Sequence, residues 1–403
     1  MRRTVALIAS AGLALGVLAL APSASAEPVP PSQFGLHVIA DPTKAVVPAT
    51  AYGSVRIWDL GVSWGKVNPK KGKFWWTGLD RAIANARNQK VSVVYVLGST
   101  PTWAASNTKQ GAYPNKGAAS MPSTSAWKDW VTAVAKRYRG QGIAYQIWNE
   151  ANLKDFWAGS PAQMATLTKT AAQIIRKYDP TATIVSASTT VRLAQSYNTF
   201  FPQYLAGLRK AGWPVDVYSV HLYPDGSGTP ATRAGYIAQV KASLAAAGAP
   251  AKPLWDTEVN YGFAGPGPVP GQNIDGDTAA AYVAQTYLDD VRLGVARAYW
   301  YSYTLSPYSR GGIQMMPGSA GTVAYNTVYG WLANSDTTCV TAAVNTCTIT
   351  KDGKVSTVAW ASSDSGAFTV PGDATTATTA SGVTSPVTPG STVTVGIMPQ
   401  LFG

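Results

Sequence analysis

Ile143-Ala144-Tyr145-Gln146-Ile147-Trp148-Asn149-Glu150 is a largely apolar run that ends in a glutamate, and Leu254-Trp255-Asp256-Thr257-Glu258 repeats this arrangement later in the chain. Runs of this kind are typical of strands in a parallel sheet that is covered on both faces. Because parallel strands end at the same edge of their sheet, we expect Glu150 and Glu258 to lie close together.

Similar runs occur at regular intervals on either side of these two. Amphipathic helical patterns lie between them, such as the one that Ser160-Pro161 opens as N-cap and first-turn proline. Eight strands that alternate with helices favour an α/β fold, a (β/α)₈ TIM barrel over residues 33–335, rather than an open doubly wound sheet. The expected strands are 34–39, 54–60, 91–99, 143–150, 183–188, 215–223, 252–260 and 296–303.

Residues 1–26 have the pattern of a secretory signal peptide. Arg2 and Arg3 precede an apolar stretch, and Ala24-Ser25-Ala26 forms a small-residue cleavage site. We expect cleavage after Ala26 and export. A membrane anchor is the alternative, which the short apolar stretch and the cleavage motif disfavour. No later segment is apolar for long enough to span a bilayer, so we expect no stable membrane insertion after the signal is removed.

The composition changes after residue 335. Short alternating runs of Thr, Ser, Val and Gly predict a small β-rich module over residues 336–403. It is small enough that we expect it to pack on the barrel. Its threonine-rich centre, 373–390, is either β-structure or a flexible loop. The two cysteines, Cys339 and Cys347, are expected to form a disulfide in an exported protein, with two free thiols as the alternative.

Charge and aromatic content restrict the possible partners. The formal net charge is +12, but lysines and arginines are scattered, which argues against a nucleic-acid partner. A diffuse positive surface suits weak attraction to an anionic cell envelope, or is a solvated surface without a dedicated partner. The 14 Trp and 20 Tyr residues include candidates for packing on the C–H faces of sugars, although most are expected in the core.

Two carboxylates at neighbouring strand ends suit the hydrolysis of a glycosidic bond. One carboxyl protonates the departing oxygen, and the other attacks or stabilises the sugar carbon. Three long Gly-, Pro- and Ser-rich loops, 104–123, 262–277 and 304–320, are expected on the same face, as a substrate cleft or as ordinary surface elaboration. The two histidines are not at metal-ligand spacing, and neither a Gly-x-Ser-x-Gly elbow nor a phosphate-binding loop occurs. We expect no metal and no cofactor.

These residues give the chain a family resemblance. It resembles the clan A retaining glycoside hydrolases and, within that clan, glycoside hydrolase family 39 and its bacterial relatives, over residues 33–335. The resemblance implies cleavage of O-glycosidic bonds by double displacement, with carboxyl groups about 5–5.5 Å apart. The supporting stretches are Val55-Arg56-Ile57-Trp58, Trp64-Gly65-Lys66-Val67-Asn68-Pro69, Thr100-Pro101-Thr102-Trp103-Ala104, Trp148-Asn149-Glu150-Ala151-Asn152 and His221-Leu222-Tyr223-Pro224, with the second glutamate at the end of strand seven.

By position, the resemblance implies that Glu150 is the general acid/base and Glu258 the nucleophile. An ionised neighbour in a partly dry cleft would raise the pKa of Glu150 and keep it protonated near neutrality. Asp256 is expected on the same side of its strand as Glu258, but deeper, as a buried partner. Two polar candidates for substrate binding are Arg56 beside the nucleophile and Asn149 at the neighbouring sugar hydroxyl, and His221 and Tyr223 are two more near the nucleophile. The aromatic candidates are Trp300, as the floor of the −1 subsite, and Trp64, Trp103 and Trp157, as sugar platforms. For Arg56 and the tryptophans, the alternative is a purely structural role.

Together these features predict a secreted, extracellular retaining glycosidase, for which association with the cell wall is a further expectation. Its expected substrate is a polysaccharide or oligosaccharide, and we expect a monomer. One alternative is a non-catalytic carbohydrate-binding barrel, which the presence of glutamate at both positions disfavours. Another is a transglycosylase that remodels wall glycans, which would use the same residues with a sugar instead of water as acceptor.

Overall fold

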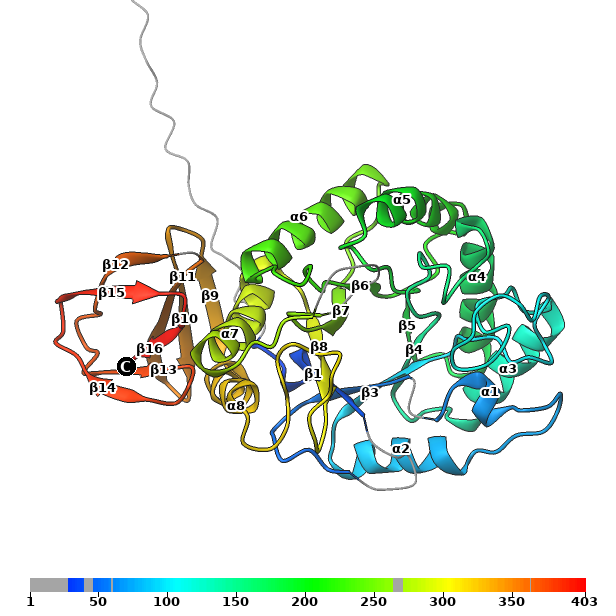
Figure 1. The fold of residues 1–403 in the computed structure, drawn as a ribbon, viewed down its shortest axis with the longest axis horizontal. Coiled ribbons are helices and arrows are strands. Elements are labelled where there is room, and N and C mark those ends of the chain that lie inside the picture. Colours follow the sequence, from blue (N-terminus) through cyan, green and yellow to red (C-terminus); the bar gives the residue numbers. More distant parts are fainter. Residues whose placement is uncertain (1–27, 40–45, 59–60, 264–270, 363) are drawn as a thin grey trace, which may run out of the picture.

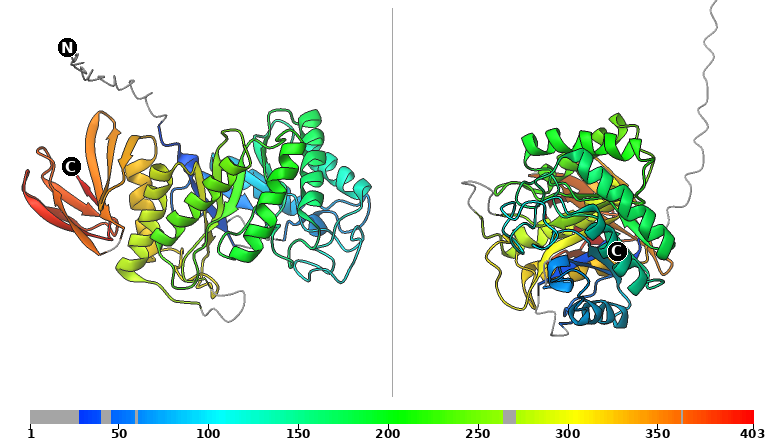
Figure 2. Two further views of the ribbon diagram at one scale, coloured as in Figure 1. Left: turned by 90° about the horizontal axis from the view of Figure 1, so that it is seen from above. Right: turned by 90° about the vertical axis from the view of Figure 1, so that its right-hand side faces the viewer.

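The computed structural model describes residues 28–39, 46–58, 61–263, 271–362 and 364–403. Figure 1 shows a ring of helices around a strand barrel, with a β-rich module beside α7 (Gly276–Leu293) and α8 (Ala320–Leu332). The views in Figure 2 place that module at one end of an elongated molecule. The expected signal peptide, residues 1–26, lies outside the described residues.

Eight parallel strands form the barrel, in the spatial order β5-β4-β3-β2-β1-β8-β7-β6. The two ends of this order meet through the parallel bridges Val185↔Val217 and Thr190↔His221, so the sheet closes on itself. The expected (β/α)₈ TIM barrel is confirmed. Its strands are β1 (Phe34–Val38), β2 (Ser54–Ile57), β3 (Ser92–Val96), β4 (Ile143–Gln146), β5 (Thr183–Val185), β6 (Tyr218–His221), β7 (Leu254–Val259) and β8 (Arg297–Tyr303).

Most strands end before the apolar run that predicts them. β4 ends at Gln146, so Asn149 and Glu150 lie in the connection that follows it, whereas Glu258 lies within β7. Hydrogen bonding continues irregularly past the end of β4, where the N–H of Ala151 donates to the carbonyl of Ser188 at 2.9 Å. The apolar composition extends further than the regular ladder because these connections are also buried.

The barrel interior is layered. An inner apolar cluster, separate from the main core, contains Ala144, Val217 and Trp255, with Val94, Val185 and Tyr299. Two residues further along the same three strands lie Gln146, Ser219 and Thr257, which are fully buried and joined by hydrogen bonds of 2.7–3.1 Å. Since residues two apart point to the same side of a strand, this polar layer sits directly above the apolar one, nearer the C-terminal ends.

Helices cover the outside of the barrel, and several begin with the caps that the sequence indicates. Ser160 and Gln163 form a reciprocal capping box at the start of α4, and α7 ends at Gly294 with φ 65°. In the described part of the chain, no helix combines the length and apolar character needed to cross a bilayer. The remaining helices are η1 (Pro31–Gln33, 3₁₀), α1 (Trp64–Val67), α2 (Thr77–Asn88), α3 (Thr124–Arg137), α4 (Pro161–Tyr178), α5 (Ala194–Lys210) and α6 (Pro230–Ala246).

The C-terminal module is antiparallel throughout. A six-stranded sheet in the order β14-β13-β16-β11-β10-β9 accompanies a two-stranded sheet of β12 and β15. The threonine-rich stretch 373–390 forms the β13–β14 hairpin rather than an irregular loop. The strands are β9 (Asp336–Val340), β10 (Val344–Lys351), β11 (Lys354–Ala361), β12 (Ser365–Thr369), β13 (Thr376–Thr379), β14 (Thr384–Pro386), β15 (Thr392–Gly396) and β16 (Gln400–Phe402).

A disulfide joins β9 to β10, and the module packs on the barrel. Cys339 and Cys347 lie directly opposite each other in the ladder and are bonded, as expected. Trp360 and Val358 belong to the same apolar cluster as the barrel helices. At the edge of that contact, the Gln285 side chain of α7 donates to the Ile397 carbonyl at 2.6 Å. The module therefore shares its core with the barrel.

Candidate active site

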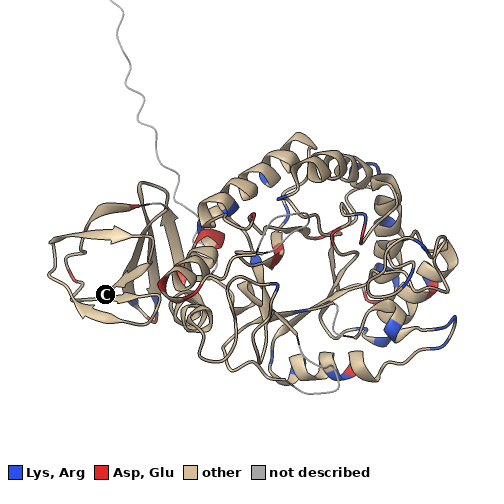
Figure 3. Cartoon of the chain, in the orientation of Figure 1, with Lys and Arg blue, Asp and Glu red and all other residues tan. Residues whose placement is uncertain are grey.

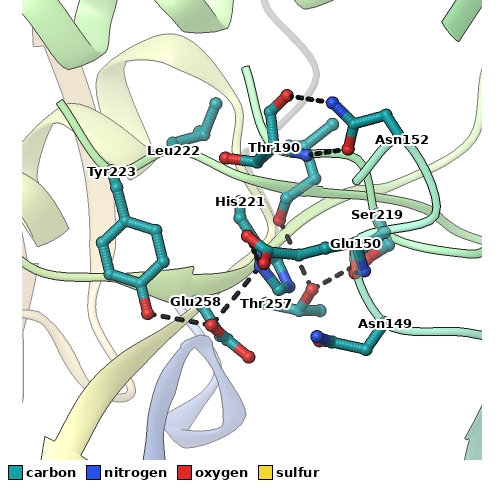
Figure 4. Close-up of polar contacts among 12 residues, drawn as sticks. Asn149, Glu150, Asn152, Thr190, Ser219, His221, Leu222, Tyr223, Thr257 and Glu258 are labelled. Carbon is teal, nitrogen blue, oxygen red and sulfur yellow. Dashed lines mark hydrogen bonds and ion pairs between the residues drawn. The ribbon is translucent and has the colours of Figure 1, made fainter. Parts of the chain in front are cut away.

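Glu150 and Glu258 meet at the C-terminal end of the barrel, as Figure 4 shows. One oxygen of each carboxylate lies within 4.8 Å of the other and of a ring nitrogen of His221. Both side chains line a cavity of about 660 Å³. Two glutamates from distant parts of the chain are thus brought to a single opening, with the separation that a covalent glycosyl-enzyme mechanism needs.

The backbone at Glu150 is unusual. Its φ is 38°, in the left-handed region that residues other than glycine rarely adopt, and its N–H donates to the Ser188 hydroxyl at 2.9 Å. Backbone strain of this kind is concentrated at functional sites, where the surroundings hold it in place. The connection after β4 therefore holds this carboxyl in a fixed position.

Glu258 accepts two hydrogen bonds and lies close to a histidine. The Arg56 guanidinium donates to Oε1 at 2.5 Å, and the Tyr223 hydroxyl donates to Oε2 at 2.9 Å. His221 Nδ1 lies 3.4 Å from the same Oε2. Both hydrogen bonds hold the Glu258 carboxyl in place, and the one from the charged Arg56 is the stronger. They also fix the orientation of this carboxyl toward the cavity.

Arg56 links Glu258 to the buried polar layer of the barrel beneath it. It is fully buried and donates to Gln146 at 2.7 Å through Nε, besides its bond to Glu258. Its third donor reaches Asn149 Oδ1, also at 2.7 Å. Because the Asn149 oxygen is engaged, its amide group is left as a donor on the cavity side, and Asn149 lines the cavity. Such a donor can bind a sugar hydroxyl.

Glu150 has the proton affinity of a general acid. Burial raises its pKa to about 7, against the opposing effects of Arg192 and Arg56. The side chain is only 12% exposed. The expected rise in pKa is therefore present, but burial is its main cause rather than repulsion from Glu258. A carboxyl with this pKa exchanges its proton readily near neutrality.

His221 lies between the two carboxylates. Its Nδ1 is 3.1 Å from Glu150 Oε1 and 3.4 Å from Glu258 Oε2. Burial lowers the pKa of His221 to about 3, an effect that Glu258 only partly offsets. The imidazole is therefore neutral near pH 7, and a proton on Nδ1 can be donated to either glutamate. The structure thus brings both predicted residues, His221 and Tyr223, to the two glutamates.

Glu150, His221 and Glu258 also have a spacing that could hold a metal ion. The local charges disfavour this use, because Arg56 and Tyr223 already donate to the two oxygens of Glu258. The positive charge of Arg192 also acts on Glu150. The absence of a cofactor stays a prediction.

The cavity wall is mainly aromatic and polar. Tyr301 and Tyr223 stand edge-to-face at 6.3 Å, and Arg192 lies over the rings of Tyr223 and Phe263 at 5.5 and 5.4 Å. These surfaces suit a sugar ring, which has apolar C–H faces and polar edges. The lining residues are Trp58, Ala112, Tyr113, Asn149, Glu150, Leu153, Asp155, Phe156, Arg192, Tyr223, Glu258, Phe263, Tyr301, Tyr308 and Arg310.

The four predicted tryptophan contacts are not in this lining. Trp64 and Trp300 are fully buried, and Trp157 is 1% exposed. Trp64 stacks on Trp130 at 5.7 Å, and Trp103 is partly buried, with its indole N–H donating to the Asn68 carbonyl at 2.8 Å. Trp64, Trp157 and Trp300 are therefore packed as core side chains, and none of the four contacts the cavity as predicted. Next to Trp300 in β8, Tyr301 lines the cavity instead.

Asp256 differs from its expected position. It was expected on the same side of β7 as Glu258, but its oxygens accept from Arg233 of α6 and from the Leu222 N–H. Thr257 faces the barrel interior, where it bonds Gln146. The register shifts between Asp256 and Val259, so the alternation of sides on which the expectation depended is interrupted there. Asp256 is a buried partner, as expected, but in the packing between barrel and helices.

Several cavity residues were missed by sequence reasoning. Arg192 follows β5 in the connection to α5, and Phe263 and Arg310 lie in two of the long loops expected on this face. The loop positions gave a signal for the last two, since loops at the C-terminal face of a barrel commonly form the site. Trp58 directly follows β2 and is the last residue of its quoted motif, and Tyr301 is the residue after Trp300.

A (β/α)₈ barrel with two facing glutamates at its C-terminal end fits the class of O-glycosyl hydrolases. The comparisons with known proteins give the family. Residues 52–307 match the pattern of glycosyl hydrolases family 39, and the chain belongs to this family of retaining glycosidases.

Individual relatives are more distant. The chain is 35% identical to a β-xylosidase of Caldicellulosiruptor saccharolyticus over 81 residues, which is 20% of this chain and 15% of that protein. The fold is similar to that of a family 39 enzyme from Xanthomonas axonopodis pv. citri, with a TM-score of 0.67 at 16% identity over 94% of this chain and 95% of that one. The fold is also similar to that of a monomeric β-xylosidase from Caulobacter crescentus, with a TM-score of 0.66 at 17% identity over 94% of this chain and 97% of that one.

Proposed function

We propose that the protein is a secreted glycosidase in which Glu258 is the nucleophile and Glu150 the general acid/base. The observation that carries this assignment is the pair of carboxylate oxygens within 4.8 Å of each other on one cavity. That spacing leaves room for an anomeric carbon but not for a separate attacking water, which fits retention of configuration.

In the first step, Glu258 attacks the anomeric carbon while Glu150 gives its proton to the departing glycosidic oxygen. The bond to the leaving group breaks as a glycosyl ester to Glu258 forms. Arg56 and Tyr223 hold Glu258 in place for this attack. The Asn149 amide is placed to donate to the hydroxyl beside the reacting carbon, a contact that strengthens as charge develops.

In the second step, Glu150, now ionised, takes a proton from water, whose oxygen attacks the same carbon and releases Glu258. The high proton affinity of Glu150 serves both steps, because it must hold a proton in the first and accept one in the second. His221 can donate its N–H to whichever glutamate is ionised at each stage.

We further propose an extracellular polysaccharide or oligosaccharide as substrate, and a monomeric enzyme. Two of the similar proteins are described as β-xylosidases, so β-xylosides are the first substrates to assay. The expected signal peptide supports export, and the monomeric state of the Caulobacter relative supports a monomeric enzyme.

Replacement of Glu258 tests the assignment. With aryl β-xylosides and wall-derived oligosaccharides, Glu258→Ala should lose roughly 10⁴-fold or more in kcat, the scale of losing a covalent nucleophile. Asp129→Ala removes an exposed carboxylate of α3 and is the matched control, with unchanged turnover. Turnover by Glu258→Ala near the wild-type rate would contradict the proposal.

A further inference from the structure

One tryptophan is placed unlike the others. Trp75 is 69% exposed, the highest exposure among the large apolar side chains of the described residues. It lies in the connection between α1 and α2, which projects from the barrel at the right-hand edge of Figure 1, on the opposite side from the β module. Leaving this much aromatic surface in water gives no stability to the fold.

The segment before Trp75 is strongly basic. Lys70, Lys71 and Lys73 are all exposed, and Figure 3 shows this part of the chain in blue. No acidic residue occurs between positions 61 and 79. Within the described part of the chain, none of these three lysines forms an ion pair. We call Trp75 together with these lysines the Trp75 surface.

The backbone that carries the surface is held rigidly. Lys70 and Lys73 pair across a turn that contains Gly72 at φ 72°, and the Trp75 N–H donates to the Val67 carbonyl at 2.7 Å. Gly72 supplies the left-handed conformation that this turn needs. The exposed ring is therefore presented on a fixed turn.

A buried asparagine fixes the turn from below. Asn68 is 2% exposed and donates to the carbonyls of Lys70 and Lys73 at 2.8 Å each. It accepts the Trp64 indole N–H at 3.2 Å, and its carbonyl accepts that of Trp103. These are two of the tryptophans expected to be sugar platforms. Their role in the structure is to support this turn.

The aromatic neighbours of Trp75 complete the support. Phe74 and Trp76 stack at 5.0 Å with rings 4° from parallel, and both stack on Trp130. Trp75 alone is left outside this stack. An exposed indole offers a flat face on which a sugar ring can pack. The unpaired ammonium groups beside it can bind negative charges carried by that sugar.

From this juxtaposition we propose that the Trp75 surface binds an acidic polysaccharide, a chain of sugar rings that carry carboxylate groups, outside the catalytic cavity. Trp75 lies in the connection that follows the C-terminal end of β2, and Trp58 in the same connection lines the catalytic cavity. The inference goes beyond the proposed catalytic function and does not depend on which bond the enzyme cleaves.

Affinity electrophoresis of the whole protein through gels with soluble polymers tests this binding. Polygalacturonate should retard the wild-type protein, and its fully methyl-esterified form, which has the same rings without the charge, should not. Trp75→Ala and the triple variant Lys70→Ala/Lys71→Ala/Lys73→Ala should each weaken binding by roughly fivefold or more, the scale of one aromatic contact. The retardation should fall as salt is added.

The control variant is Lys169→Ala/Lys210→Ala/Lys354→Ala, which removes the same charge from exposed sites on α4, α5 and the β module. It should bind like the wild type. Poly(glycerol phosphate), an anionic polymer without sugar rings, should bind more weakly and without dependence on Trp75. The proposal would be overturned if the methyl ester or poly(glycerol phosphate) bound the protein as strongly as polygalacturonate does. It would also be overturned if Trp75→Ala bound polygalacturonate as strongly as the wild type. The assay has no catalytic step, so its failure is distinguishable from a failure of the Glu258 assignment.

Discussion

Two buried arginine–carboxylate networks lie beside each other on β7, and they differ in what they face. Arg56 binds Glu258 and Asn149, both of which line the cavity. Arg233 binds Asp256 and Asp290, at 2.6–3.0 Å, where all three side chains are at most 1% exposed. The second network is closed by protein on every side, whereas the first is open toward the cavity.

This difference distinguishes a network that stabilises the fold from one that can contact a substrate. A closed network holds α6 and α7 against the barrel, and removal of one partner leaves buried hydrogen-bond donors without an acceptor. The open network has the same components, but its groups can exchange a protein contact for a substrate contact. The two networks therefore respond differently to mutation, in activity for one and in stability for the other.

After the loss of the nucleophile, the largest effect is expected at Glu150, the acid beside the open network. Glu150→Ala should lose about 10²–10⁴-fold in kcat/KM on substrates with poor leaving groups, the usual contribution of general acid catalysis. Aryl glycosides with activated leaving groups should lose much less, because their leaving oxygen departs without a proton. A plot of rate against leaving-group pKa for both proteins measures the difference. Equal losses across the series would exclude Glu150 as the acid.

The closed network should respond in stability. Asp256→Ala should lower the free energy of unfolding by about 3–5 kcal/mol, because two Arg233 donors and the Leu222 N–H lose their buried acceptor. Denaturant titration measures this loss. Glu258→Ala is the matched variant on the same strand and should lose less, since the cavity lets water reach the donor that Arg56 presents there. A larger loss in Glu258→Ala would contradict the distinction between the two networks.

The smallest effect is a shift in pH dependence. Since the Glu150 pKa is about 7, kcat/KM should fall as pH rises through that value, when the acid loses its proton. The positive charge of Arg192 stabilises the carboxylate and lowers this pKa. Arg192→Met should therefore move the alkaline limb to higher pH, while Arg192→Lys keeps the charge and should leave it nearly in place. If the alkaline limb of Arg192→Met moved to lower pH, the predicted effect of the Arg192 charge on the Glu150 pKa would have the wrong sign.

The fold could be predicted from the sequence because its signal is local. Each buried strand is an apolar run, and each helix such as α4 has its own cap and stripe. Glu150 and Glu258 could also be predicted, because a carboxylate at the end of such a run has little structural reason to be there. Arg56 and Asn149 came from the same quoted motifs.

The tryptophans and Asp256 could not be placed in this way. Burial of Trp64 and Trp300 depends on helices and loops far away in the chain, and nothing local distinguishes a stacked core ring from a sugar platform. Asp256 was misplaced because a register shift in β7 interrupts the two-residue period. Arg192 was missed because a single arginine in a connection has no pattern that marks it.

The most direct test of the catalytic assignment is to trap the glycosyl-enzyme. An activated aryl 2-deoxy-2-fluoro-β-xyloside, or the corresponding derivative of the best substrate, should inactivate the enzyme with release of one aryl group per chain. Peptide mass analysis should then find the sugar esterified to Glu258, and the adduct should be absent from Glu258→Ala. An adduct on another side chain, or hydrolysis with inversion of configuration, would contradict the account.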